Sequence, residues 1–320
     1  MKVEKLSLSH QALLQQRFDR LSVKLSDYSF ANLYLFRHIH DYTVIQIDEE
    51  VFIQGRTRDQ ARFIMLTRPP SLAQLALLKT MKSQPFLLFP IPSEWLVKLP
   101  VLNVNAYHHE EDSDYLFTKN KLATYPGRHL SKKRNLVKQF LSHSTIQQHP
   151  LTSFNQQLAL QLLEAWQDEQ LTDKKETDYA SCQEAILLVE QLHLTGILWV
   201  VNQQVAGLTI GELVRQDCFV LHFLKGLKHV PEFHQVIPQQ LAMSLDADIQ
   251  FKGLYQTIYQ ELALSLNATV EWINLEQDLG IEGLRQAKHS YLPDLLLPKW
   301  RIPFENNQEG SFENDPSIKN

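Results

Sequence analysis

The chain has 320 residues, of which 44% are hydrophobic and 21% charged, and its formal net charge at pH 7 is −5. These values are typical of a globular protein, and they exclude a chain that is disordered throughout or that coats nucleic acid with its whole surface. Two cysteines are too few for a disulfide framework or a zinc–thiolate site. The start, MKVEKLSLSH, lacks the apolar core of a signal peptide, and no stretch approaches 18 uninterrupted apolar residues. We therefore expect a cytoplasmic protein without an integral membrane segment.

The first part of the chain alternates between helical and strand-like patterns. Apolar spacing, turn residues and N-cap residues predict, in chain order, a helix over 9–23, two strands within 43–55, a strand over 62–67, a helix over 71–81 with Ser71 as its N-cap, and a buried strand over 85–91. This order is a helix, antiparallel strands, a helix and a strand.

The same order of elements recurs later in the chain. Apolar spacing and turn residues predict a helix over 178–194, strands within 197–212 and 217–226, a helix over 232–245 that Pro238 interrupts, a helix over 253–266 and a strand over 269–275. Two similar α/β (α+β) domains in tandem, with mixed and mostly antiparallel sheets flanked by helices, explain this repeat. We place the domains at residues 1–145 and 146–304, and we expect the polar tail 305–320 to be disordered.

A basic segment lies between Lys119 and Lys138, where no acidic residue occurs. Ser131 is the predicted N-cap of a helix whose first turn is basic, although cations oppose the helix dipole there. An anion such as a phosphate, a pyrophosphate or a tRNA backbone would explain the arrangement, and a solvated basic face is the alternative. The candidate phosphate-binding residues are Arg128, Lys132, Lys133, Arg134, Asn135 and, at the end of a later strand, Lys225.

A carboxylate and an imidazole are predicted to meet on the strands around the turn Arg215-Gln216-Asp217. With the turn centred there, Glu212 lies opposite Val220, and Ile210 lies opposite His222. Glu212 and His222 would then share a face of the sheet, as a candidate catalytic pair that deprotonates an attacking group. A buried hydrogen bond without a catalytic role is the alternative.

Histidines elsewhere do not predict a metal site. His38 and His40 alternate along a strand-like stretch, and His108 and His109 precede three acidic residues. Neighbouring residues of an extended chain point in opposite directions, and no companion with the spacing of a ligand is apparent. We therefore expect no bound metal.

Four stretches resemble the signatures of proteins related to the C-terminal domain of bacterial phosphatidylglycerol lysyltransferases. They are SDYSFANLYLFR (26–37), YPGRHLSKKRNLVKQF (125–140), VAGLTIGE (205–212) and INLEQDLGIEGLRQAKHSYLP (273–293). The resemblance covers the chain from about residue 25 to residue 300 and is most specific in the last stretch. It implies two tandem GNAT-like (acyl-CoA N-acyltransferase) domains.

The resemblance also implies a function. It is the transfer of an acyl or aminoacyl group from acyl-CoA or aminoacyl-tRNA to an amine or hydroxyl of a small molecule or lipid, with no permanently bound cofactor. Leu224 stands where the family pattern has an acidic residue, and the membrane-embedded half of the lysyltransferases is absent from this sequence. Both departures argue against lipid aminoacylation and leave the expected fold unchanged. Leu224 also favours the alternative of a non-catalytic ligand-binding or regulatory protein with the same fold.

The stretch after the strand at 269–275 completes the candidate site. Under the resemblance, its acidic residues line a cleft and bind a substrate amine, and a glycine lets the backbone approach the ligand. The alternative is that Glu276 and Asp278 pair with Arg285 or Lys288 and only fix the loop. The candidate substrate-binding residues are Asn274, Glu276, Asp278, Gly280, Arg285 and Lys288.

Overall fold

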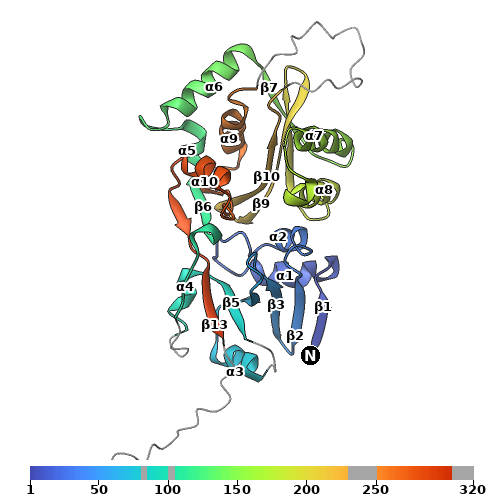
Figure 1. Cartoon of the computed structure of the whole chain (residues 1–320), viewed down its shortest axis with the longest axis vertical. Coiled ribbons are helices and arrows are strands. Elements are labelled where there is room, and N and C mark those ends of the chain that lie inside the picture. The colour runs from blue at the N-terminus through green and yellow to red at the C-terminus, as the bar shows by residue number, and fades with distance from the viewer. Residues whose placement is uncertain (81–84, 100–104, 230–250, 305–320) are drawn as a thin grey trace, which may run out of the picture.

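Two β-sheets, one above the other in Figure 1, form the framework of the molecule. The computed structural model describes residues 1–80, 85–99, 105–229 and 251–304. The first sheet contains, in spatial order, β1 (Lys2–Lys5), β2 (Thr43–Ile47), β3 (Glu50–Arg56), β4 (Arg62–Leu66), β5 (Phe86–Ile91) and β13 (Trp300–Phe304). The second contains β12 (Leu295–Leu297), β6 (Asp114–Thr118), β11 (Trp272–Asn274), β10 (Cys218–Gly226), β9 (Gln204–Arg215), β8 (Thr195–Val201) and β7 (Ile146–Pro150).

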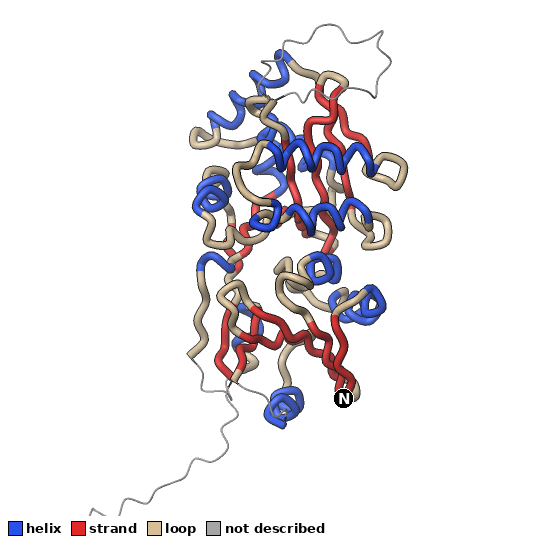
Figure 2. The backbone as a smooth tube through the Cα atoms, turned by 45° about the vertical axis from the view of Figure 1, so that its right-hand side comes forward, coloured by secondary structure: helices blue, strands red, loops and turns tan. Residues whose placement is uncertain are grey.

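Helices cover both sheets (Figures 1 and 2). α7 (Gln156–Asp168) and α8 (Tyr179–Leu187) lie on one face of the second sheet, and α5 (Lys119–Thr124), α6 (Ser131–His143) and α9 (Leu254–Ser265) pack together on the other side. α1 (Gln11–Phe18) and α2 (Phe30–Leu35) lie between the two sheets. The remaining helices are α3 (Leu72–Thr80), α4 (Ser93–Leu96), α10 (Glu282–His289) and the 3₁₀ turns at Leu8–His10, Glu110–Asp112 and Lys174–Glu176.

The two sheets repeat one pairing order. In the first, β2, β3 and β4 are antiparallel, and the chain then passes through α3 to β5, which is parallel to β4. In the second, β8, β9 and β10 are antiparallel, and the chain passes through α9 to β11, which is parallel to β10. The predicted fold of two tandem, mixed, mostly antiparallel α/β units is therefore confirmed.

The sheets also exchange strands along the chain. β6 follows β5 in sequence but pairs with β11 in the second sheet, and β13 ends the described chain but pairs with β5 in the first. The predicted division after residue 145 therefore does not separate the sheets. We call the first sheet with α1–α4 the first unit, and the second sheet with α5–α10 the second unit.

Side-chain caps explain some of the helix ends, and others differ from the predictions. Ser71 caps α3, because its Oγ accepts the Gln74 N–H at 3.2 Å and the Gln74 side chain accepts the Ser71 N–H. Ser131 was predicted as the N-cap of α6 but is its first helical residue, and the cap position falls on Leu130, which offers no side-chain acceptor. The predicted helix over 232–245 and the tail 305–320 lie outside the described residues. Within the described part of the chain, no helix has the length and apolar character needed to cross a membrane.

Lys299 joins the two units where the chain enters β13. Its side chain is 1% exposed, and its Nζ lies 2.6 Å from a carboxylate oxygen of Asp27 and 2.8 Å from one of Asp114. Burial alone would lower the pKa of Lys299, but the two carboxylates outweigh it and hold this pKa above its ordinary value. The ammonium group thus links a loop of the first unit to β6 of the second.

We predict that Lys299→Met lowers the free energy of unfolding by about 3–5 kcal/mol, because it leaves the fully buried Asp114 without its cation. Urea unfolding measures this change. Lys98→Met, at an exposed position in the first unit, is the control and should change the free energy of unfolding by less than about 0.5 kcal/mol. Equal effects of the two substitutions would contradict the linking role of Lys299.

Candidate functional site

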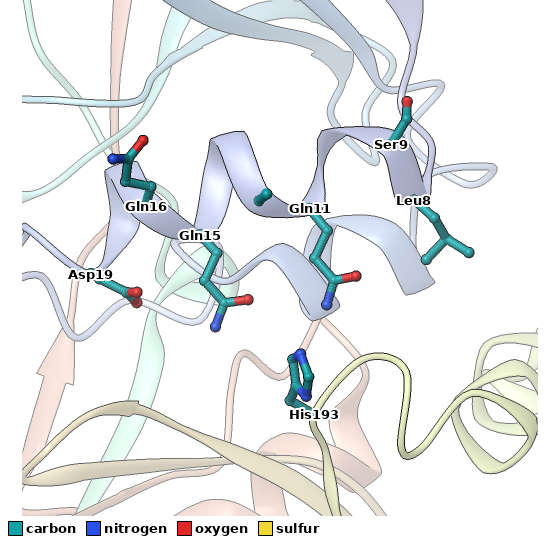
Figure 3. Close-up of a pocket in the computed structure, with 8 residues that line it drawn as sticks. Leu8, Ser9, Gln11, Gln15, Gln16, Asp19 and His193 are labelled. Atoms are coloured by element: carbon teal, nitrogen blue, oxygen red, sulfur yellow. The ribbon is translucent and has the colours of Figure 1, made fainter.

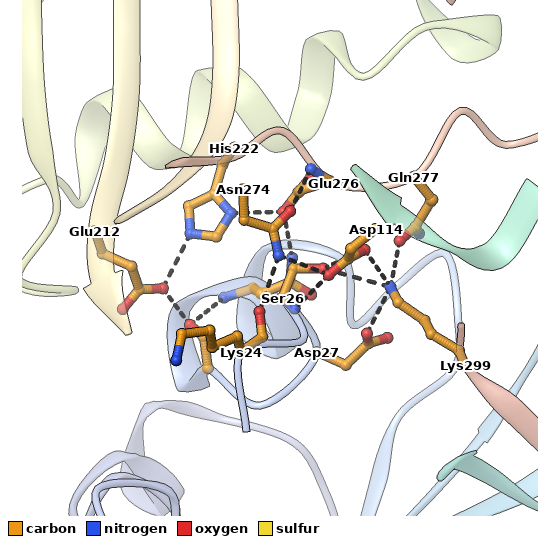
Figure 4. Close-up of polar contacts among 12 residues, drawn as sticks. Lys24, Ser26, Asp27, Asp114, Glu212, His222, Asn274, Glu276, Gln277 and Lys299 are labelled. Atoms are coloured by element: carbon orange, nitrogen blue, oxygen red, sulfur yellow. Dashed lines mark hydrogen bonds and ion pairs between the residues drawn. The ribbon is translucent and has the colours of Figure 1, made fainter. Parts of the chain in front are cut away.

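A polar cluster lies where α2 meets the second unit (Figure 4). At its centre is His222 on β10, whose side chain is fully buried. Its Nε2 lies 2.9 Å from Oε1 of Glu212 on β9, and its Nδ1 lies 2.8 Å from Oε1 of Glu276 in the loop after β11. The Glu212 and Glu276 side chains are 15% and 16% exposed. The cluster brings together the predicted catalytic pair and one residue of the predicted substrate loop.

A β-bulge places His222 in this cluster. Glu212 lies opposite Val220 as predicted, but Phe223 rather than His222 pairs with Ile210, so that part of the predicted register is wrong. His222 is the extra residue of the bulge, and such a residue is aimed differently from its neighbours on the strand. The alternation of apolar residues along the strand does not reveal a bulge of this kind.

The imidazole ring of His222 is charged near neutral pH. Burial alone would lower its pKa, but the hydrogen bonds and charges of Glu212 and Glu276 outweigh burial and raise the pKa of His222 to about 10. Both ring nitrogens then donate hydrogen bonds, one to each carboxylate. In this arrangement both ring nitrogens of His222 are bonded to carboxylates, and neither is free to accept a proton from a substrate.

Two side chains of the first unit complete the cluster. Ser29, the N-cap of α2, donates its hydroxyl to Oε1 of Glu212, and Asn32 Nδ2 donates to Oε1 of Glu276 at 2.8 Å. Both residues lie in the stretch 26–37 that carries the family resemblance, but no pattern in the sequence indicates a role for either side chain. In the described part of the chain, Oε2 of Glu212 and Oε2 of Glu276 have no hydrogen-bond partner.

The cluster lies where β10 and β11 separate. The two strands pair only from Cys218 to Val220, although β10 continues to Gly226. After Asn274 the chain follows β6 instead, because the Leu275 N–H donates to the carbonyl of Tyr115 at 2.9 Å. Glu276 has a φ of 58°, a left-handed conformation that is uncommon for glutamate. The strand separation and this backbone conformation direct the Glu276 side chain towards β10.

Asn274 was predicted to bind substrate, but both the nitrogen and the oxygen of its side chain form hydrogen bonds within the protein. Its Nδ2 donates to the Lys24 carbonyl at 2.9 Å and to Asp114 at 2.8 Å, and its Oδ1 accepts the Glu276 N–H at 2.6 Å. The residue is completely buried. Asn274 therefore holds the backbone from which Glu276 projects.

Asp278 likewise holds the loop. It is completely buried and accepts hydrogen bonds from Tyr115 Oη at 2.7 Å, from Arg285 Nε at 2.8 Å and from the Gly280 N–H at 2.8 Å. Burial tends to raise the pKa of Asp278, but these partners, with Arg285 first, bring it below its ordinary value. Lys288 donates its Nζ to the carbonyls of Glu276 and Gln277, and burial lowers the pKa of Lys288 to about 8. Asp278 and Arg285 therefore pair as in the alternative interpretation, whereas Lys288 fixes the loop through backbone carbonyls rather than through an ion pair.

Gly280 is required by its backbone conformation rather than by a close approach. Its φ is 70°, in the left-handed region that favours glycine. A Cβ added there would meet nothing closer than the Glu111 side chain at 3.6 Å, an ordinary contact distance. The predicted close approach of backbone to ligand at this glycine is thus not needed to explain it.

The predicted phosphate-binding residues fall into two groups. Lys133 donates to Ser290 Oγ at 2.8 Å, Arg134 to the Gly127 carbonyl at 2.7 Å, and Lys225 to Asp178 at 2.6 Å, so these three cations have partners within the protein. The remaining candidates are exposed, and their side chains have no hydrogen-bond partner among the residues that the structure describes; they are Arg128, Lys132 and Asn135.

Other polar features lie apart from this cluster. Among the described residues, no group of three or more His, Cys, Asp and Glu side chains is arranged to hold a metal ion. An open groove runs along α1, with Gln11, Gln15 and His193 among its lining residues (Figure 3). None of the predicted site residues lines this groove.

The chain matches the model of the family described as "Phosphatidylglycerol lysyltransferase, C-terminal" over residues 18–302. This match spans most of the chain and includes all four of the stretches that carry the resemblance. No curated protein matches the chain.

Solved structures share the fold. A conserved protein of unknown function from Bacteroides thetaiotaomicron is 22% identical, with a TM-score of 0.78, and the alignment covers 95% of this chain and 100% of that one. The C-terminal domain of a putative lysylphosphatidylglycerol synthetase from Agrobacterium fabrum is 11% identical, with a TM-score of 0.58 and 92% of each chain covered. L-PGS from Bacillus licheniformis is 10% identical, with a TM-score of 0.58 and coverage of 93% of this chain and 92% of that one. At these identities the likeness concerns the fold.

The charged state of His222 predicts a distinct pH dependence of stability. The folded pKa of about 10 exceeds the ordinary value of 6.5, so the stabilisation is complete below pH 6.5 and is lost as the pH rises through 10. We predict that His222→Gln lowers the free energy of unfolding at pH 6 by roughly 3 kcal/mol, and that the difference from wild type shrinks as the pH approaches 10. Urea unfolding of both proteins between pH 6 and pH 10 measures this. A difference that stays constant over that range would contradict a charged His222.

Proposed function

Because the chain belongs to the family of phosphatidylglycerol lysyltransferase C-terminal domains, we propose that it transfers an aminoacyl group and that Glu212 and Glu276 hold the ammonium group of its substrate. Family membership supports acyl or aminoacyl transfer as the general class of reaction. The ammonium-bearing substrate and the polyanionic donor described below are our inferences from the site.

The observation that carries the proposal is the pair of free carboxylate oxygens. Each carboxylate is fixed through its Oε1, and its Oε2 has no partner in the described part of the chain. Two carboxylates and one imidazolium leave one net negative charge, which a substrate ammonium group would neutralise. Both side chains remain partly exposed, so a ligand has access to them. Partial burial strengthens such a charge pair relative to water.

The reaction would proceed by direct attack of the acceptor on the donor. The acceptor hydroxyl or amine forms a bond to the carbonyl carbon of the aminoacyl ester, and the bond between that carbon and the donor oxygen breaks. The acceptor's proton passes to a carboxylate oxygen, for which Glu212 is our candidate, and then to the departing donor oxygen. His222 keeps its protons throughout and holds the two carboxylates in place.

A charged tRNA is the donor that we favour over acyl-CoA. An aminoacyl group carries the ammonium that the two carboxylates are arranged to bind, whereas a simple acyl group carries none. The exposed cations Arg128 and Lys132, which have no partner among the described residues, suit a polyanionic backbone. Lys133, in the basic segment, donates to Ser290 at the end of α10, and Lys288 of α10 donates to the Glu276 carbonyl. These two contacts connect the basic segment to the site through α10.

A non-catalytic binding protein is the second candidate. Two observations favour it: Leu224 stands where the family pattern has an acidic residue, and both ring nitrogens of His222 are bonded to carboxylates within the protein. Both candidates use the same charge-selective site, and only the first forms a transfer product.

We predict that Glu276→Gln weakens the binding of alaninamide, a protonated amine, by about tenfold or more, because one of the two carboxylates is lost. N-acetylalaninamide, which lacks the charge, is the control ligand, and NMR titration at pH 6.5 measures both affinities. Asp278→Asn is the control variant; it should lower the free energy of unfolding by about 1–3 kcal/mol and leave the preference for the charged ligand unchanged. If the wild-type protein binds both ligands equally, the proposed ammonium site is wrong.

The basic segment generates a second prediction for the donor. The double substitution Arg128→Glu and Lys132→Glu should weaken the binding of bulk tRNA and reduce the slope of log K against log salt concentration by about 2. Lys79→Glu, on α3 at the opposite end of the molecule in Figure 1, is the matched charge reversal and should change the slope little. The slope is obtained from tRNA affinities measured between 50 and 200 mM salt. An unaltered slope in the double variant would indicate that Arg128 and Lys132 belong to a solvated basic face and do not contact the donor.

A further inference from the structure

The stretch SDYSFANLYLFR, residues 26–37, carries the family resemblance but has no part in the function proposed so far. In the structure it is one of the segments of the first unit that contact the second unit. The Ser26 N–H donates to Asp114 at 2.7 Å, and Arg37 forms two hydrogen bonds with Glu184 of α8, at 2.8 and 2.7 Å. These contacts hold the units together.

Ser29 and Asn32 differ from the other residues of the stretch, because their partners are the two carboxylates of the ammonium site. Oε1 of Glu212 accepts one hydrogen bond from Ser29 and one from His222. Oε1 of Glu276 accepts one from Asn32 and one from His222. Each carboxylate is therefore held by one donor from the first unit and one from the second.

The first turn of α2 fixes the direction of these donors. Ser29 Oγ accepts the Asn32 N–H at 3.1 Å as the N-cap of the helix. A hydroxyl has a single proton, and with its acceptor side occupied by the helix that proton is free to point at Glu212. Asn32 is 9% exposed and lies one turn further along, so its amide has little freedom to move away from Glu276.

We propose that Ser29 and Asn32 are positioning residues of the ammonium site: by fixing Oε1 of Glu212 and of Glu276, they hold each carboxylate in one orientation and keep its Oε2 atom available to the ligand. This inference rests on the function proposed above. It means that the first unit completes a site whose charged groups all belong to the second unit. A carboxylate held by one donor can rotate about its last bond, whereas one held by two donors presents its free oxygen in a single direction.

The test compares substitutions of the positioning residues with a substitution that affects only the contact between the units. Asn32→Leu and Ser29→Ala remove one donor each, and Glu184→Gln weakens the Arg37 contact outside the site. The readout is the ratio of the affinities of the full chain for alaninamide and N-acetylalaninamide. We expect each donor variant to lower this ratio about tenfold, and Glu184→Gln to leave it unchanged. Equal losses in all three variants, or no loss in the donor variants, would overturn the proposal.

Two further measurements keep the test decisive. Ser29→Thr retains both the hydroxyl and the helix cap, and it should restore the affinity ratio to within about twofold of wild type. The pKa of His222, measured by NMR without any ligand, should fall in Asn32→Leu and in Ser29→Ala, because a carboxylate that is free to rotate supports the imidazolium less well. An unchanged His222 pKa in both variants would refute the positioning role. If the wild-type protein does not prefer the charged ligand while the His222 pKa responds as expected, the proposed function fails and the positioning of the carboxylates stands.

Discussion

The buried charge on His222 is the constraint on which the candidate site depends. A lone imidazolium would be costly in the interior, and it is stable here because Glu212 and Glu276 each accept one of its ring protons. The three side chains come from β9, β10 and the loop after β11, and they meet where β10 and β11 separate. The left-handed conformation of Glu276 is maintained by the same contact and by the Asn274 side chain that accepts its N–H.

The exchange of strands between the sheets explains why residues of the first unit can serve a site in the second. β6 and β13 each pair with the sheet built mainly from the other part of the chain, and Lys299 joins the two at a buried ion pair. The units are therefore held in one relative position by backbone pairing as well as by side chains. A site that draws donors from both units requires this fixed relation.

The sequence was sufficient to predict the fold and part of the site. Local patterns predicted the repeated order of helices and strands but not β6 and β13, and the pairing of Glu212 with Val220 followed from a turn centred on residues 215–217. The bulge at His222 was not predictable, because one extra residue leaves no mark in the alternation of apolar residues. The contacts of Ser29 and Asn32 were not predictable either, since they join residues 183 and 244 positions apart.

The partners of the predicted ligand-binding residues within the chain could not be predicted from the sequence either. The sequence shows that Asp278 and Lys225 carry ionisable side chains, but it does not show that these side chains pair with Arg285 and Asp178. From the sequence, the acidic loop could bind a ligand or only fix its own conformation, and packing distinguishes the two for each residue. Asp278 is completely buried and paired, whereas Glu276 keeps one oxygen free and 16% of its side chain exposed.

The central claim is that one protonated histidine organises both carboxylates, and the nitrogen NMR spectrum of His222 tests it most directly. With the protein labelled with ¹⁵N at histidine, and His222 assigned by comparison with His222→Gln, the spectrum at pH 7.5 reports whether each ring nitrogen carries a proton. The account predicts a proton on both nitrogens, because the pKa of His222 is raised to about 10. A neutral ring with a single protonated nitrogen at pH 7.5 would contradict it.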